Sequence, residues 1–275
     1  MTSERHGRLD RGDGVELAWA ALPGAGPAAH HAEAATVVFL GGFRSDMEGT
    51  KALALRDLCA RRGDAFLRLD YSGHGQSAGR FEDGCIGTWA EDAAQVIDAV
   101  APGPLVLVGS SMGGWIALLL ARRWGMRVRA MIGIAAAPDF TYRLMEPELT
   151  RAQRAELERD GITHLPSDYG PPVPITALLL QDGRAQSVLD RPLPFAGPVR
   201  LLQGMRDAEV PWSTATDLAA HLGATDVQIT LVKDGDHRLS RPQDLSLLAE
   251  SLTSLLRALD GGEPLPVGGI PPLQP

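Results

Sequence analysis

Cysteine is scarce in this sequence, since Cys59 and Cys85 are the only two among 275 residues. Two cysteines this far apart match neither a disulfide framework nor the short spacing of a metal-binding knuckle. Cys59 also falls on the apolar face of an expected helix, where a free thiol behaves as a small hydrophobic side chain. We therefore expect two buried free thiols and no metal site.

Basic charge and long apolar runs are lacking as well. The chain has 26 Lys and Arg against 34 Asp and Glu, a net charge of −8, whereas nucleic-acid-binding domains present basic surfaces. No apolar run approaches the roughly 18 residues of a membrane-spanning helix, and no hydrophobic segment of a signal peptide follows the N-terminal residues. We therefore expect a cytoplasmic protein with no membrane span and no nucleic acid among its partners.

Short apolar stretches alternate with amphipathic ones along most of the chain. The expected strands are 15–20, 36–40, 65–70, 105–108, 128–134, 199–203 and 227–232, and the expected helices are 48–62, 88–100, 114–124, 212–222 and 242–259. Thr88 followed by Glu91 matches a capping box and predicts where the second of these helices begins. The alternation predicts an α/β fold with a doubly wound, mostly parallel sheet.

Residues 139–194 interrupt this order. They contain a charged helical stretch over 147–159 and a Pro-rich stretch over 165–174. We interpret the whole segment as a cap inserted over the carboxyl ends of the strands, where α/β proteins bind their ligands. The core would then comprise 1–138 and 195–260, and the Gly- and Pro-rich residues 261–275 would form a flexible tail.

The most informative motif is Gly109-Ser110-Ser111-Met112-Gly113, which joins an apolar strand directly to a helix. A strand, a sharp turn and a helix are what a nucleophile elbow requires, with glycines where the two backbones approach each other. The pentapeptide alone also occurs by chance, so its context matters. Ser111 is the expected nucleophile. Ser110 fits less well, because Val108 and Met112 would then occupy the glycine positions.

A serine hydroxyl is a poor nucleophile at neutral pH and needs a base that can also protonate the leaving group. His237 follows the expected strand 227–232 and precedes the last helix, which places it at the functional end of the sheet. The other histidines are terminal, in a turn, in the cap or on a helix surface: His6, His30, His31, His74, His164 and His221. We expect His237 to be the base.

An acid should follow a strand between the elbow and the histidine, where it can orient the imidazole. Asp207 meets this condition, because it lies just beyond the expected strand 199–203. Glu209 and Asp236 remain alternatives, although a residue adjacent to a histidine rarely faces its ring. Two backbone N–H groups should stabilise the oxyanion, and we expect them to come from Met112 and Phe43.

With these residues in place, the sequence resembles the α/β-hydrolases, and within them the branch of mitochondrial palmitoyl-protein thioesterases and acyl-glucuronide esterases. The matching stretches are 49–54, 68–75, 109–115, 200–207, 210–212 and 236–238. The resemblance implies an α/β-hydrolase fold, a triad of Ser111, Asp207 and His237, and oxyanion donors at Phe43 and Met112.

The N-terminal residues depart from that branch. Glu4, Asp10 and Asp13 interrupt the acid-poor composition of a transit peptide. The sequence is therefore interpreted as a bacterial-type cytoplasmic relative.

The expected activity is hydrolysis of acyl esters or thioesters through an acyl-Ser111 intermediate, without a metal or organic cofactor. The partner would be a small-molecule or acyl-protein substrate. Haloalkane or epoxide cleavage on the same fold is disfavoured, because those reactions use an aspartate where this chain has Ser111. A ligand-binding or scaffold protein without catalysis is the alternative, since a fold does not guarantee a function.

Overall fold

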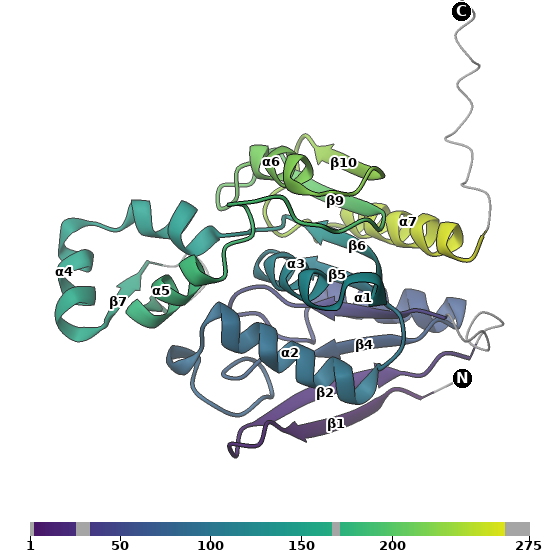
Figure 1. Ribbon diagram of the computed structural model, residues 1–275, viewed down its shortest axis with the longest axis horizontal. Coiled ribbons are helices and arrows are strands. Elements are labelled where there is room, and N and C mark those ends of the chain that lie inside the picture. Colours follow the sequence, from purple (N-terminus) through teal and green to yellow (C-terminus); the bar gives the residue numbers. More distant parts are fainter. Residues whose placement is uncertain (1–2, 26–33, 167–170, 262–275) are drawn as a thin grey trace, which may run out of the picture.

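A large sheet forms the centre of the protein (Figure 1). The computed structural model describes residues 3–25, 34–166 and 171–261. In chain order its strands are β1 (Arg5–Asp10), β2 (Glu16–Leu22), β3 (Thr36–Leu40), β4 (Phe66–Leu69), β5 (Leu105–Ser110), β6 (Val128–Ile134), β7 (Ile162–Leu165), β8 (Val173–Thr176), β9 (Val199–Gly204) and β10 (Val227–Val232).

Within the described residues, eight of these strands pair in the order β1-β2-β4-β3-β5-β6-β9-β10, and β7 pairs with β8 separately. The pairs β1-β2 and β2-β4 are antiparallel, and the remaining pairs of the large sheet are parallel. The mostly parallel α/β sheet expected from the sequence is therefore confirmed.

Helices cover both faces of this sheet. They are α1 (Thr50–Arg62), α2 (Ile86–Val100), α3 (Met112–Trp124), α6 (Ser213–His221) and α7 (Pro242–Leu259). Along β3, Val37 and Phe39 pack with side chains of α1 and α7, whereas Val38 and Leu40 pack with those of α2 and α3. Successive side chains of a strand point to opposite faces, so a continuously apolar strand is what a sheet covered on both sides needs.

Strand β1 was not expected from the sequence. Its residues are mostly exposed, because it forms the edge of the sheet, and the stretch therefore lacks an apolar periodicity. Gly7 sits directly against the indole of Trp19 on β2, and a Cβ atom there would overlap with the ring. Both cysteines are buried and free, as expected.

The capping box expected at Thr88 is absent, because α2 begins two residues earlier, at Ile86. The backbone N–H of Gly87, in the first turn, donates to the carboxylate of Asp182 at 2.7 Å. Glu91 instead forms an ion pair with Arg123 of α3. The carboxylate of Asp182, from a helix far along the chain, thus accepts the N-terminal backbone N–H that a local side chain was expected to cap.

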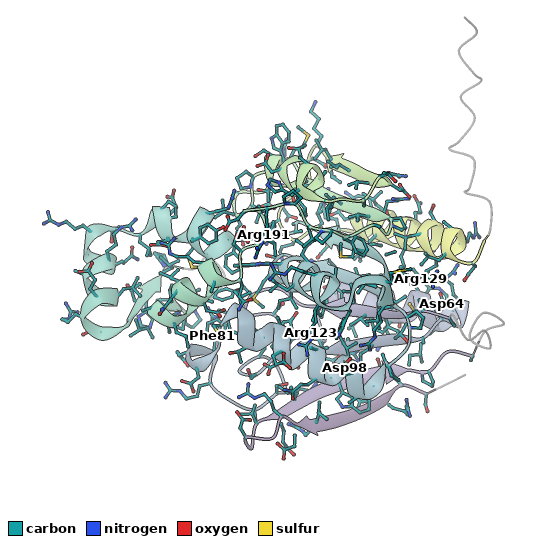
Figure 2. The ribbon with its side chains drawn as sticks, viewed as in Figure 1. Asp64, Phe81, Asp98, Arg123, Arg129 and Arg191 are labelled. Carbon is teal, nitrogen blue, oxygen red and sulfur yellow. The ribbon has the colours of Figure 1, made fainter. Side chains whose placement is uncertain are left out.

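The segment between β6 and β9 departs from the α/β alternation. It contains two short helical turns (Thr141–Met145 and Glu146–Glu148), α4 (Arg151–Asp160), β7, β8 and α5 (Ala177–Ala185), and it lies to one side of the core in Figure 1. We call residues 139–194 the cap segment. Phe81, labelled in Figure 2, lies on the part of the core nearest to it. The division between cap and core stays a prediction.

The start and the end of the cap segment meet at one buried carboxylate. Asp139, at φ 59°, accepts hydrogen bonds from the backbone N–H groups of Val188 at 2.9 Å and Leu189 at 3.0 Å. The hydroxyl groups of Ser187 and Tyr142 also donate to it, each at 2.9 Å. The tail expected at 261–275 lies, apart from Gly261, outside the described residues.

Candidate active site

Ser111 occupies the sharp turn between β5 and α3. Its φ of 53° lies in the left-handed region, which is strained for a residue with a side chain. A Cβ atom at Gly109 would overlap with the backbone of Gly113, and one at Gly113 would overlap with the carbonyl of Leu40 on β3. The glycines expected to permit the tight turn are therefore required by their surroundings.

Three side chains from separate loops meet beside this turn. Nε2 of His237 lies 3.1 Å from Oγ of Ser111, and Nδ1 of the same ring lies 2.8 Å from Oδ2 of Asp207. Ser111 follows β5, Asp207 follows β9 and His237 follows β10. Because β5, β9 and β10 run parallel within one sheet, their carboxyl ends point to the same edge and bring the three residues together.

Asp207 is held in place by four hydrogen bonds. Oδ1 accepts from the backbone N–H groups of Glu209 at 2.9 Å and Val210 at 2.8 Å, and Oδ2 accepts from Nε2 of Gln203 at 2.9 Å as well as from His237. Burial disfavours the charge, but the hydrogen bonds from His237 and Val210 outweigh it and keep the pKa of Asp207 below its ordinary value. Asp207 is therefore ionised at neutral pH.

The alternatives left open by the sequence make different contacts. Ser110 is a buried residue of β5 itself. Asp236 accepts the backbone N–H of Leu239 at 3.0 Å. Glu209 does reach His237, but its Oε2 lies 3.5 Å from Nε2, on the side of the ring that faces Ser111.

Two residues near the site were not anticipated. Gln203, at the end of β9, anchors Asp207 as described above. Lys51 of α1 donates from Nζ to the backbone carbonyl of Arg238, which follows His237. Burial and the charge of Arg238 lower the pKa of Lys51 to about 8, against the opposing effect of Asp236 and Asp244. In the sequence, the only signal for Gln203 is its position near the end of an expected strand, and Lys51 has no such signal.

The two residues expected to supply oxyanion donors flank Ser111. Met112 is the first residue of α3, at the helix end where backbone N–H groups are free of intrahelical bonds and the dipole is positive. The backbone of Gly42 passes close to Ser111, since a Cβ atom at Gly42 would lie 3.4 Å from that of Ser111. Phe43 follows directly, with its ring packed edge-on against Phe140.

A cavity of about 280 Å³ opens at Ser111. The core contributes Phe43, Ser111, Ala137, Glu209, Val210 and His237 to its lining, and the cap segment contributes Phe140, Leu144, Met145, Glu148 and Leu165. Most of the cap side chains are apolar. The site can therefore hold an apolar group next to the Ser111 hydroxyl and the imidazole of His237.

Within residues 3–25, 34–166 and 171–261, no three His, Cys, Asp or Glu side chains are placed so as to hold a metal ion. None of the helices described is long and apolar enough to cross a membrane.

Comparison with known proteins identifies the family. A model of the alpha/beta hydrolase family matches residues 37–264. The chain belongs to this family. The human palmitoyl-protein thioesterase ABHD10, mitochondrial, is 36% identical over 253 residues, which cover 91% of this chain and 80% of the human protein.

Solved structures of this hydrolase family agree. A crystal structure from Agrobacterium vitis S4 is 44% identical and superposes with a TM-score of 0.85, covering 93% of this chain and 99% of that one. Alpha/beta hydrolase domain-containing protein 10 from mouse is 35% identical with a TM-score of 0.82, over 93% and 99% of the two chains. The fold class and the family resemblance expected from the sequence are confirmed.

The cytoplasmic location expected from the sequence is wrong. The cattle, orangutan and human relatives are named as mitochondrial proteins, which contradicts this expectation. Of the acidic residues used for the expectation, Asp10 is the last residue of β1, Glu4 precedes β1, and Asp13 lies between β1 and β2. Glu4 pairs with the buried Arg68 at 2.8 Å, and Asp13 pairs with Arg11.

Proposed function

We propose that this hydrolase cleaves acyl esters or thioesters, with Ser111 as the nucleophile. The observation that carries the proposal is the pair of contacts made by His237, at 3.1 Å to Ser111 and 2.8 Å to Asp207. The carboxylate of Asp207 can only accept a hydrogen bond, so Nδ1 carries the proton and Nε2 is free to accept one from the Ser111 hydroxyl.

The reaction proceeds in two halves. Oγ of Ser111 attacks the acyl carbon, its proton passes to Nε2 of His237, and the same proton is delivered to the oxygen or sulfur of the leaving group as its bond to carbon breaks. Water then attacks the acyl-Ser111 ester and gives one proton to His237, which returns it to Oγ of Ser111. Asp207 stabilises the imidazolium in both halves.

The oxyanion of each tetrahedral intermediate lies between the backbone N–H groups of Met112 and Phe43. Both groups belong to fixed backbone beside Ser111, so little reorganisation is needed when the negative charge develops. The positive end of the α3 dipole favours the same charge. The reaction is complete with these groups and calls for no metal or organic cofactor.

The acyl chain occupies the cavity beneath the cap segment. Its apolar lining from Phe140, Leu144, Met145 and Leu165 suits an alkyl chain. Palmitoyl-protein thioesterase is the activity named for the curated relatives, which supports a thioester among the substrates. The leaving group is then a small molecule or the thiol of an acylated protein.

The test compares wild type with Ser111→Ala on a panel of acyl p-nitrophenyl esters, acyl-CoA thioesters and acyl glucuronides. Removing a serine nucleophile costs about 10⁶ in turnover while the fold is kept. Ser110→Ala is the matched control and should keep its activity. Retention of more than a tenth of wild-type turnover by Ser111→Ala would rule out the assignment.

A fluorophosphonate probe separates catalysis from mere ligand binding. It should label wild type and Ser110→Ala but not Ser111→Ala, because the label is an ester of the nucleophile. A protein that binds acyl ligands yet takes no label would be a scaffold member of the family.

A further inference from the structure

The backbone from Gly41 to Arg44 is held at both ends by the turn that follows β4. Oη of Tyr71 donates to the carbonyl oxygen of Gly41 at 3.2 Å. The backbone N–H of Arg44 donates to Nε2 of His74, also at 3.2 Å. Tyr71 and His74 are both buried, and they lie three positions apart in that turn.

These two contacts fix the peptides on either side of one oxyanion donor. Tyr71 fixes the peptide that joins Gly41 to Gly42, and His74 fixes the peptide that joins Phe43 to Arg44. The N–H of Phe43 belongs to the peptide between them. Only the dihedral angles of Gly42 and Phe43 separate it from these fixed neighbours, and the Gly42 carbonyl of the same peptide accepts from the N–H and the hydroxyl of Ser45 at 3.2 and 2.7 Å. The three contacts together set the direction of the Phe43 N–H.

The hydrogen bond at Arg44 also stabilises a strained backbone conformation. Arg44 has a φ of 58°, in the left-handed region that is strained for a residue with a side chain. Such a conformation persists only where the surroundings enforce it. The hydrogen bond to His74 is made by the N–H of this strained residue.

The surroundings of His74 also fix its tautomer. Nδ1 lies 3.2 Å from the carbonyl oxygen of Ser72, which can only accept, so Nδ1 carries the proton. Nε2 is then unprotonated and accepts from Arg44. Burial lowers the pKa of His74, against the opposing effects of the Ser72 carbonyl and of Asp92, so the ring is neutral at pH 7.

The ring has little freedom to move. It packs edge-on against Tyr71, Phe81 and Trp89, with centroid distances of 5.0 to 5.6 Å. Ser72, which accepts from Nδ1, is itself anchored because its N–H and its hydroxyl both donate to Asp92, at 2.9 and 2.6 Å.

We propose that His74 is a positioning residue, which aims the backbone N–H of Phe43 at the oxyanion through its hydrogen bond to Arg44. This inference rests on the proposed acyl transfer at Ser111. His74 touches neither the substrate nor Ser111, and it acts only on the loop. Since the oxyanion exists only in the tetrahedral intermediates and the adjoining transition states, the loss of His74 should lower kcat and leave KM nearly unchanged.

The experiment uses two substitutions of equal length. His74→Met removes the acceptor but fills the space with an adaptable apolar side chain, and His74→Gln keeps an acceptor oxygen within reach of Arg44. Removing an oxyanion donor outright costs about 10² to 10³ in kcat. We expect misdirection of the donor in His74→Met to cost about 10- to 100-fold, with KM within threefold, and His74→Gln to recover most of the loss.

An inhibitor gives a second readout that a merely structural role would not move. A trifluoromethyl ketone forms an anionic tetrahedral adduct with a serine, so its inhibition constant depends on the oxyanion donors. It should weaken in His74→Met by the same factor as kcat. Leu252→Ala, in the buried core beneath α7 and away from this cluster, should lower the melting temperature while kcat stays within threefold.

Three outcomes overturn the inference while the proposed function stands, provided that Ser111→Ala is inactive. They are an unchanged kcat in His74→Met, equal losses in the Met and Gln variants, and a rise in KM without a change in kcat. If His74→Met fails to fold, ¹⁵N NMR of the wild-type ring decides, because an Nε2–H tautomer or an imidazolium at pH 7 contradicts the proposal. Activity retained by Ser111→Ala would instead overturn the proposed function.

Discussion

Asp207 and Glu209 lie two positions apart in one loop, yet they contact opposite nitrogens of the same imidazole. The side chain of Asp207 is fully buried and reaches Nδ1 of His237 at 2.8 Å, whereas that of Glu209, which is 55% exposed, reaches Nε2 at 3.5 Å. Only the carboxylate at Nδ1 leaves Nε2 free to take the proton of Ser111. The geometry thus supports Asp207, the acid expected from the sequence, over Glu209, which the sequence had left as an alternative.

Asp207→Asn should lower turnover by about 10⁴, because an amide at this position favours the wrong tautomer of His237 while keeping the shape. Glu209→Gln is the matched control, and it should keep kcat within about tenfold because its side chain is exposed and weakly coupled. Steady-state kinetics on a p-nitrophenyl ester measures both. A large loss in Glu209→Gln with little loss in Asp207→Asn would reassign the acid.

Gly113→Ala should abolish activity and destabilise the fold by about 3 kcal/mol, because the new methyl group would overlap with the carbonyl of Leu40 in a region with no space to yield. Gly103→Ala provides the comparison, since a Cβ atom there meets nothing within 4 Å. Chemical denaturation and esterase assays of the two variants should differ sharply. Equal stability of the two proteins would contradict the packing described for the elbow.

Because the pKa of Lys51 is lowered, we expect the free energy of unfolding to rise with pH. Its pKa is about 8 in the folded protein and 10.5 ordinarily, so between these values the unfolded chain binds a proton that the folded protein has released. The free energy of unfolding should therefore increase with pH across this window, by at most about 3 kcal/mol.

Lys51→Met isolates this contribution from other titrating groups. The difference in unfolding free energy between wild type and Lys51→Met, measured in urea from pH 7 to 10, should be flat below pH 8 and should then grow in favour of wild type. Parallel curves over the whole range would show that Lys51 keeps its ordinary pKa.

Acyl-chain preference should be set by the cap segment. Each methylene buried in an apolar cavity contributes about 0.8 kcal/mol, so kcat/KM should rise about fourfold per carbon until the cavity is full. Leu144→Ala and Leu165→Ala enlarge the cavity and should extend the rise to longer chains. Leu231→Ala, on the exposed edge strand β10, should leave the profile unchanged. Identical profiles in all variants would assign the preference to the core.

The parts of the fold and site that could be predicted are those encoded locally. The apolar run of β5 and the glycines around Ser111 specify the elbow within one short stretch. His237 and Asp207 could be placed because each follows a strand, and parallel strands bring their ends to one edge. The long helix α7 shows the same locality, with the bounds expected from its apolar spacing.

The remainder depends on contacts between residues far apart in the sequence. The start of α2 is set by Asp182 of α5, and no local pattern near Thr88 reveals this. β1 is polar because it is an edge strand, so its pairing with β2 leaves no apolar period. His74 was placed correctly in a turn, but its hydrogen bond to Arg44 appears only when β3 and β4 lie side by side.

Asp139 has a consequence for how this protein can be altered. Its carboxylate accepts hydrogen bonds from residues 187–189 near the C-terminal end of the cap segment, so the two ends of the segment lie next to each other. β6 precedes the segment and β9 follows it, and these two strands pair with each other directly in the sheet. We therefore expect that a segment of different length or sequence can replace residues 139–194 if it keeps the contacts of Asp139, and that such an exchange would change the substrate range without altering the sheet.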